Sequence, residues 1–243
     1  MPGTSPGMTD KIKNVRSGEN HAMITVHHLN NSRSQRILWL LEELGLPYEV
    51  VKYERNSETR LAPAALKTVH PLGKAPVIVD DGRTLAESGA IMEYILRKYG
   101  RGRLSPPEAS QAYFDHLYWM HFAEGSAMLP LLLALYTSRL GEAAAPLTPR
   151  ISGETAAMLG HMESALKGKD YFIGPELDAA DIQLSFVVEA ADARDLLVNY
   201  PNLKAFIERC HARPAYKRSI DKGGPFNLRR PPAPAPQPAA AAR

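Results

Sequence analysis

The first part of the chain alternates between strand patterns and helix patterns. Three β-rich runs read MITVHHL, YEVVKY and APVIVDDGRTLAE, and the Asp-Gly pair inside the last run is typical of a β-hairpin. Gly45 ends a predicted helix whose apolar residues recur at helical spacing, namely Ile37, Leu38, Leu41 and Leu44. The segment APAALKTV predicts a short helix that Pro71 cannot continue, and a longer helix is expected from about 88 to 99.

The order of these elements predicts their directions, and the pattern then changes. The order is β-α-β-α-β-β-α, so the first two strands should be parallel and the last two antiparallel. The segment GRGRLSPPEAS has the composition of a linker. After it, helical spacing covers residues 108 to 140, 149 to 167, 181 to 197 and 202 to 221. An α/β half followed by an all-helical half predicts two packed domains with a ligand site at their seam.

Domain boundaries follow from the same changes in composition. We expect an α/β domain over 23–100, a linker over 101–107 and an all-helical domain over 108–224. Residues 1–22 are polar and contain no apolar segment of the kind found in secretory signals, so they are expected to be a disordered lead-in. The Pro/Ala-rich end, 225–243, is expected to be a disordered tail.

Charge and cysteine content exclude several classes of function. The formal net charge is 29 − 26 = +3, and no block of Lys and Arg indicates nucleic-acid binding. Cys210 is the only cysteine, which excludes an internal disulfide framework and cysteine-rich zinc sites and fits a reducing, cytoplasmic setting. No apolar run approaches the roughly 20 residues of a membrane span. His27 and His28 are adjacent on a predicted strand and face opposite sides, so no metal site is predicted there.

One motif lies where the first strand gives way to the first helix. Ser32 precedes Gln35 by three residues, and this Ser-x-x-Gln spacing predicts a capping box at the helix start. The simplest interpretation is a cap. A hydroxyl at a helix N-terminus is also well placed to hold an anion, which is the functional alternative.

Two further motifs have a structural and a functional interpretation. In GKAPVI, Pro76 either starts a strand or forms a cis peptide bond that would turn the backbone of Ala75 toward an extended, peptide-like ligand. In AESGAI, Ser88 is expected to be an N-cap. Alternatively, its hydroxyl and the helix N–H groups hold a carboxylate, while Glu87 pairs with an ammonium group.

Together, in this order and spacing, the motifs place the chain near a known family. Residues 23 to 221 resemble the cytosolic glutathione transferases in NNSRSQRILWLLEELGLPYE, HPLGKAPVIVDDG, LAESGAIMEYI and RPAYKR. The stretch YWMHFAEGSAMLPLLL is similar to the fungal and bacterial subgroup related to the yeast Gtt-type enzymes. The resemblance implies an α/β thioredoxin-like N-terminal domain followed by an all-α C-terminal domain.

The resemblance also implies roles for individual residues. Ser32 matches the hydroxyl that binds the thiol of glutathione in the serine-type classes, with Asn31 or Asn30 as the alternative donor. The family's tyrosine and cysteine alternatives are absent from this turn, and its Ser/Thr-x-x-Asp cap becomes Asp178-x-x-Asp181. The remaining matches to glutathione-binding positions are Lys74 for the glycyl carboxylate, Ala75 and Pro76 for the cysteinyl backbone, and Glu87 and Ser88 for the γ-glutamyl end. We therefore predict that the bond before Pro76 is cis and that Ala75 offers its backbone to the ligand.

A stripe of residues near the start of the helical half has helical spacing: Tyr113, Leu117, Met120, Glu124 and Met128. Core packing is the usual reason for such a stripe. The resemblance places this helix across from Ser32, which implies that part of the stripe lines a pocket for a second substrate. Glu124 has three possible roles: a cap, a partner for a basic side chain, or an anchor for the ammonium of glutathione.

The activity implied by the resemblance is conjugation of glutathione to small hydrophobic electrophiles, as in detoxification. Glutathione would be a co-substrate, and no permanently bound cofactor, nucleic acid or membrane is expected. Glutathione-dependent peroxide reduction is an alternative that uses the same thiolate, and a non-catalytic glutathione-binding or scaffold module is another. The family also implies a homodimer.

Overall fold

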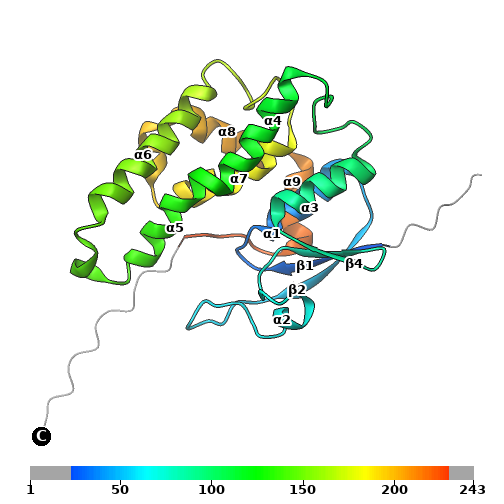
Figure 1. The fold of residues 1–243 in the computed structure, drawn as a ribbon, viewed down its shortest axis with the longest axis horizontal. Helices are drawn as coiled ribbons and strands as arrows, with labels where there is room; N and C mark the ends of the chain where they lie inside the picture. The colour runs from blue at the N-terminus through cyan, green and yellow to red at the C-terminus, as the bar shows by residue number, and fades with distance from the viewer. Residues whose placement is uncertain (1–22, 230–243) are drawn as a thin grey trace, which may run out of the picture.

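A computed structural model describes residues 23–229, and it divides them into a sheet-containing part and a helical part (Figure 1). The sheet part contains β1 (Ile24–Leu29), α1 (Ser34–Leu44), β2 (Tyr48–Tyr53), α2 (Leu66–Val69), β3 (Val77–Asp80), β4 (Arg83–Ala86) and α3 (Ser88–Ile95). The helical part contains α4 (Gln111–Phe122), α5 (Met128–Thr137), α6 (Thr148–Ala165), α7 (Ala179–Asp192), α8 (Pro201–Ala212) and α9 (Pro214–Gly223). This two-part architecture confirms the predicted fold class.

The sheet has the strand order β2-β1-β3-β4. β1 and β2 are parallel, while β3 is antiparallel to both β1 and β4, so the predicted strand directions are confirmed. Val77 pairs with His27 on one side and with Ala86 on the other. Continuing these registers places Ala75 opposite Leu29 and Pro76 opposite Glu87. The segments after β1, before β3 and after β4 therefore meet at one edge of the sheet.

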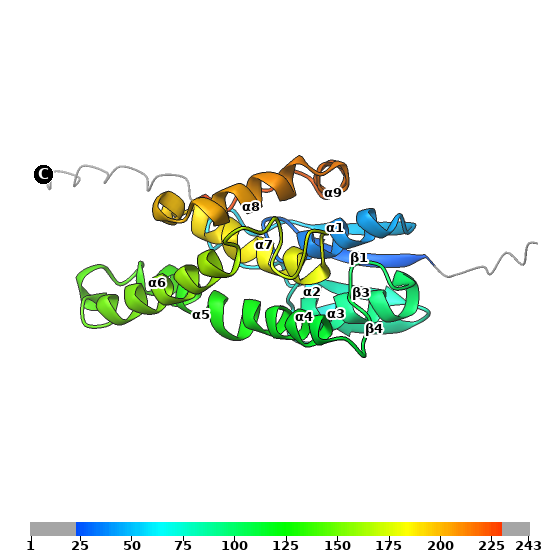
Figure 2. The same ribbon diagram turned by 90° about the horizontal axis from the view of Figure 1, so that it is seen from above.

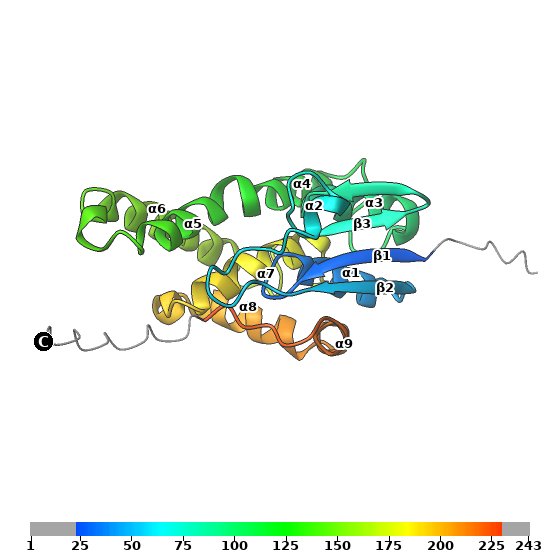
Figure 3. The same cartoon turned by 90° about the horizontal axis from the view of Figure 1, so that it is seen from below.

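α1 lies between the sheet and the helical part, where it packs against β1, α3, α7 and α9 (Figures 2 and 3). Nearly all of its residues are buried. Gly223, at the end of α9, approaches α1 so closely that a Cβ atom there would lie 2.7 Å from Leu38 Cδ1. A side chain at this position would force Leu38 to shift, and the contact places the end of α9 next to the first turn of α1.

α7 is the central helix of the second part, and its residues are buried from Ala179 to Ala191. It begins with the predicted capping box: the side chain of Asp178 accepts from the helix start, while Asp181 Oδ2 accepts from the N–H of Asp178 at 2.8 Å. Cys210 is fully buried in α8 among apolar side chains. No helix within 23–229 is long and apolar enough to cross a membrane.

Several of the predicted helices are divided or shortened. The stretch 108 to 140 is α4 and α5 joined by π-helical residues Ala123–Ala127, and α3 gives way to a second π-helical segment at Leu96–Gly100. The stretch 202 to 221 is divided into α8 and α9 at Pro214, because the residue before a proline avoids the helical conformation and Arg213 is extended.

Two predicted caps are wrong, and each has a tertiary reason. The Ser32–Gln35 box does not form, because the Gln35 side chain donates instead to Ser219 Oγ of α9 at 2.7 Å. Ser88 is the first residue of α3 and not its N-cap, a position taken by Glu87 with a φ of 72°. The Ser88 hydroxyl is occupied by side chains from other elements.

The ends of the chain were predicted to be disordered. Residues 1–22 and 230–243 lie outside the described part, so that prediction is not examined for them. For 225–229 it is wrong: Phe226 and Leu228 pack against the core, and Arg229 Nη1 donates to Asp195 Oδ1 at 2.8 Å. The described chain therefore continues past α9 and back toward the site.

Candidate functional site

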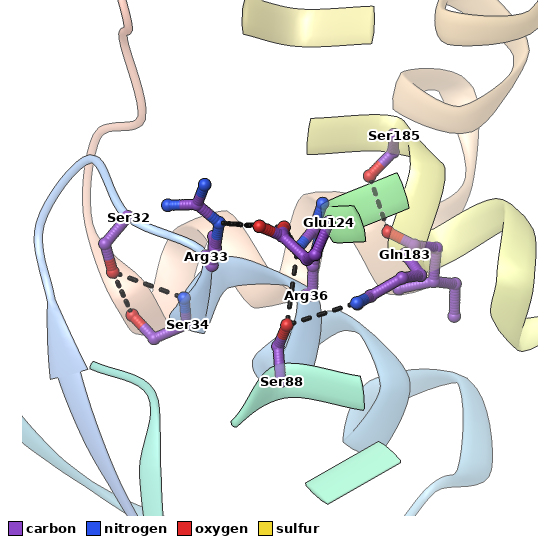
Figure 4. A network of polar contacts seen from close by, with 9 residues as sticks. Ser32, Arg33, Ser34, Arg36, Ser88, Glu124, Gln183 and Ser185 are labelled. Atoms are coloured by element: carbon purple, nitrogen blue, oxygen red, sulfur yellow. Dashed lines mark hydrogen bonds and ion pairs between the residues drawn. The ribbon is translucent and has the colours of Figure 1, made fainter. Parts of the chain in front are cut away.

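Ser32 lies in the tight segment between β1 and α1, with only 5% of its surface exposed. Its Oγ accepts the backbone N–H of Ser34 at 3.2 Å and lies 2.7 Å from Ser34 Oγ (Figure 4). The hydroxyl thus still satisfies one of the unpaired donors at the start of α1, although the predicted box is absent. Ser32 therefore places a fixed hydroxyl at the positive end of a helix dipole.

Two arginines of α1 and its preceding turn share one carboxylate from the helical part. Arg33 Nε donates to both oxygens of Glu124, at 2.8 and 2.9 Å, and Arg36 Nη1 donates to Glu124 Oε1 at 2.5 Å (Figure 4). Of the three roles considered for Glu124, pairing with a basic side chain is confirmed. The cluster keeps one net positive charge, which favours an anion bound nearby.

Burial and charge act in opposite directions on Glu124. Burial raises the pKa of its carboxyl, but the charges and hydrogen bonds of Arg36 and Arg33 outweigh burial and leave the pKa below its usual value. Both guanidinium groups also lie over the ring of Phe186 of α7, each 5.1 Å from its centre. The arginines are therefore held at the seam between the two parts of the molecule.

Ser88 connects this cluster to the start of α3. Its Oγ accepts from Arg36 Nη1 at 3.3 Å and from Gln183 Nε2 of α7 at 3.2 Å (Figure 4). The side chain is buried, and the N–H groups of the first turn of α3 lie at the same place. A hydroxyl, a helix N-terminus and a cation behind them form an arrangement suited to a carboxylate.

The remaining predicted binding residues lie on the loops at the same sheet edge. The Ala75–Pro76 peptide bond is cis, as predicted. Pro76 is buried and Ala75 is partly exposed just before β3, while Lys74 and Glu87 are exposed on either side. The strand registers bring these residues next to the segment that leads from β1 to Ser32.

The two asparagines before Ser32 each have their side-chain oxygen engaged. Asn30 Oδ1 accepts the N–H of Arg55 at 2.9 Å. Asn31 Oδ1 accepts the N–H of Asn227 at 2.7 Å, which attaches the segment after α9 to the turn that carries Ser32. Each amide nitrogen remains chemically able to donate, so both residues stay alternatives to Ser32.

The five residues of the predicted second-substrate stripe lie in different environments. Met120 and Met128 are buried in the hydrophobic core, Leu117 is half-buried, and Glu124 pairs with the arginines. Tyr113 stacks on His116 and lines a cavity of about 370 Å³ beside the linker. The pocket for a second substrate therefore stays a prediction.

The sequence did not indicate four residues that contact the predicted ones or, in the case of His28, a partner of a predicted one. Ser34 and Arg33 are next to Ser32, and the Ser-x-Ser spacing was the signal that could have identified Ser34. His28 carries no such signal, and neither does Gln183, which reaches Ser88 from 95 positions away. Among residues 23–229 no group of three His, Cys, Asp or Glu side chains is placed to hold a metal ion.

Family models of two domains match the chain. The model described as "Glutathione S-transferase, N-terminal domain" matches residues 21–97, and "Glutathione S-transferase, C-terminal domain" matches residues 123–214. These spans agree with the sheet part and with most of the helical part.

Three relatives illustrate the similarity. Glutathione S-transferase 3 of Schizosaccharomyces pombe is 38% identical over 217 residues, covering 82% of this chain and 88% of the relative. The crystal structure of a glutathione S-transferase from Actinobacillus pleuropneumoniae has a TM-score of 0.76 and 36% identity, covering 83% of this chain and 93% of the other. A glutathione transferase family member from Pseudomonas fluorescens, with two glutathione bound, has a TM-score of 0.70 and 26% identity, covering 82% and 92%.

Proposed function

The chain belongs to the glutathione S-transferase family, and from that premise we propose that it activates glutathione as a thiolate for conjugation to small hydrophobic electrophiles. The observation that carries the proposal is the Ser32 hydroxyl, held at the start of α1 beside a cluster with one net positive charge. Only the thiolate is nucleophilic, so the site must bind it in preference to the thiol.

The free energy needed to lower the pKa of the bound thiol is larger than a helix dipole supplies, so the Ser32 hydroxyl is the main contributor. A free thiol has a pKa of about 8.5, and lowering it by ~2 units takes ~2.7 kcal/mol of preferential thiolate binding. A helix N-terminus supplies ~0.3–1 kcal/mol. A hydrogen bond to a charged partner adds ~1.5–3 kcal/mol. The dipole alone is too small, so the donor Ser32 supplies the larger share.

The proposed binding mode extends the tripeptide along the sheet edge. The γ-glutamyl carboxylate lies at Ser88 and the first turn of α3, with Glu87 paired to the ammonium group. The cysteinyl backbone pairs with Ala75 next to Pro76, and Lys74 meets the glycyl carboxylate. The strand registers support this order, because they bring all three segments to the edge where Ser32 lies.

We also propose a homodimer in the cytoplasm. The helices α4 and α5 lie along one outer side of the molecule (Figure 2). Five of their apolar side chains are exposed: Phe114, Tyr118, Leu129, Leu133 and Tyr136. A second copy of the chain is the proposed partner for this face, which would otherwise leave a large apolar surface in water. One buried cysteine and no disulfide among the described residues fit a reducing compartment.

Binding and turnover test the function separately. We expect retention on immobilised glutathione, elution by free glutathione, and turnover of a chloronitroarene. Turnover of an organic hydroperoxide without the chloronitroarene would instead favour the peroxidase. Retention with neither activity would favour a non-catalytic module, and absence of retention would contradict glutathione binding altogether.

A further inference from the structure

A chain of hydrogen bonds leads from Ser32 into the protein interior. Ser32 Oγ lies 2.7 Å from Ser34 Oγ, and Ser34 Oγ lies 2.9 Å from Nδ1 of His28. The three residues are buried, with exposed fractions of 5%, 0% and 3% in that order. They come from the end of β1 and the start of α1, so the backbone holds all three groups in place.

The direction of these hydrogen bonds follows from the state of His28. Burial and the charge of Lys52 lower the pKa of His28 to about 4, so the ring is neutral at pH 7. The backbone of Gly223 hydrogen-bonds to the ring and raises its pKa, as only an accepting carbonyl does. A neutral imidazole has one N–H, which the Gly223 carbonyl takes, so Nδ1 is the acceptor. Ser34 therefore has two acceptors for its one proton, Nδ1 of His28 at 2.9 Å and the Leu29 carbonyl at 3.2 Å, and it donates to His28 across the shorter contact.

This direction determines where the Ser32 proton lies before a ligand binds. With its own proton on His28, Ser34 Oγ is an acceptor, and it already takes the N–H of Leu29 at 3.2 Å. The 2.7 Å contact between the two hydroxyls is then a donation from Ser32 to Ser34. Ser32 is held on both sides, since it also accepts the N–H of Ser34.

A thiolate at the site would reverse the direction of these hydrogen bonds. Ser32 would turn its proton to the sulfur, because a hydrogen bond to a charged acceptor is roughly twice as strong as a neutral one. Two hydroxyl oxygens 2.7 Å apart then need a proton between them, and Ser34 can supply it by turning away from His28. In the resulting order, Ser34 donates to Ser32 and Ser32 donates to sulfur, so each bond polarises the next.

We infer that Ser34 is a positioning residue whose hydroxyl holds Ser32. When the thiolate forms, the hydroxyl proton of Ser34 turns from His28 to Ser32. The inference rests on the proposed function, in which Ser32 binds the thiol of glutathione. It adds that the donor is a chain of two hydroxyls, with His28 as the resting acceptor.

Replacing Ser34 tests the chain by a pH profile. Ser34→Ala should raise the pKa of the bound thiol by about 0.5–1 unit, which lowers the rate with a chloronitroarene near pH 7 by about 1.5- to threefold. The rate should recover at high pH, and the KM for glutathione should change less than twofold. Ser185→Ala is the matched control, because it also removes a buried hydroxyl, but one that donates to the Ile182 carbonyl of its own helix and has no link to Ser32.

A spectroscopic readout follows the proton directly in the full chain. The ¹⁵N signal of His28 Nδ1, identified by its loss in His28→Gln, should shift when glutathione binds at pH 8. It should not shift with S-methylglutathione, which has no thiolate. If both ligands or neither shift it, or if Ser34→Ala has the same pH profile as Ser185→Ala, the inference is overturned. If Ser32→Ala also behaves as the parent, the proposed role of Ser32 fails as well.

Discussion

Arg36 is a buried cation whose position is better explained by function than by packing. It is 1% exposed, and its Nη1 reaches both Glu124 and Ser88. Its Nε and Nη2 are buried without a hydrogen-bond partner in the structure, while the face of the guanidinium lies over Phe186. Burying a cation with two unpaired donors costs stability, and a charge kept there despite this cost fits a role toward an anion.

Glu124→Gln tests how much of this cluster depends on the carboxylate. We expect a loss of about 2 kcal/mol in the free energy of unfolding at pH 7, below the 3–5 kcal/mol of a fully buried pair because 34% of the Glu124 side chain is exposed. The pKa of Glu124 is lowered in the folded protein, so its contribution is present above about pH 4.5 and is lost on acidification.

Urea unfolding at pH 3, 5 and 7 measures the effect of Glu124. The parent should lose more stability between pH 5 and pH 3 than the Gln variant does. Glu108→Gln, at an exposed carboxylate, is the control and should follow the parent. Parallel curves for the parent and Glu124→Gln would show that the carboxylate does not stabilise the fold by its charge.

For single residues, the sequence predicted which positions matter better than it predicted their contacts with distant residues. The cis bond at Pro76 was predicted, and pairing with a base was one of three roles considered for Glu124. The contact of Ser88 with Gln183 was not predicted, because its partners lie 95 positions apart and no local pattern relates them. Whether Ser32 acts as predicted stays to be tested.

Helix ends show when local sequence is sufficient. The Asp178-x-x-Asp181 spacing predicted the start of α7 correctly, because both carboxylates bond to backbone groups of the same turn. The equivalent prediction for Ser32 and Gln35 failed, since a buried hydroxyl on α9 offers Gln35 a partner that the local spacing cannot reveal. Tertiary contacts thus override local capping where two helices pack closely.

Asp181→Asn tests the electrostatic cost of the cap of α7. Burial raises the pKa of Asp181 to about 7, despite the N–H groups of Phe172 and Asp178 that it accepts. The folded state therefore binds a proton that the unfolded state releases above about pH 4, and stability falls as the pH rises toward 7. The parent should lose about 2–4 kcal/mol relative to Asp181→Asn over this range.

Thermal or urea unfolding of both proteins from pH 4 to pH 8 provides the comparison. Asp221→Asn, at an exposed position, should retain the pH dependence of the parent. A difference between the parent and Asp181→Asn that stays constant over this range would show that Asp181 does not titrate between pH 4 and pH 7.

The arrangement of the whole molecule was largely predictable, and its details were not. Strand directions and the change from an α/β part to a helical part follow from patterns that each segment carries itself. The return of residues 225–229 to the site does not, because it depends on Phe226 meeting Phe186 and on Asn227 meeting Asn31. The Pro and Ala content of the C-terminal end predicted disorder there, but Phe226 and Leu228 pack against the core.

The proposed dimer is tested by placing a charge on its apolar face. Leu133→Glu should convert a dimer to a monomer, since an unpaired carboxylate at a buried interface is costly. Light scattering at micromolar protein measures the mass. Val198→Glu is the control, because Val198 is an exposed apolar residue in another region and its variant should stay dimeric. A monomeric parent would contradict the dimer outright.

The most direct test of the account is the pH profile of Ser32→Ala. The variant should fold, lose about 1 kcal/mol as a helix-start donor is left unpaired, and raise the pKa of bound glutathione by ~1–2 units. Conjugation near pH 7, followed with a chloronitroarene, should slow by ~3–25-fold and recover as the pH rises. A variant with the rate and pH profile of the parent would contradict the claim that Ser32 activates the thiol and would leave Asn30 or Asn31 as the donor.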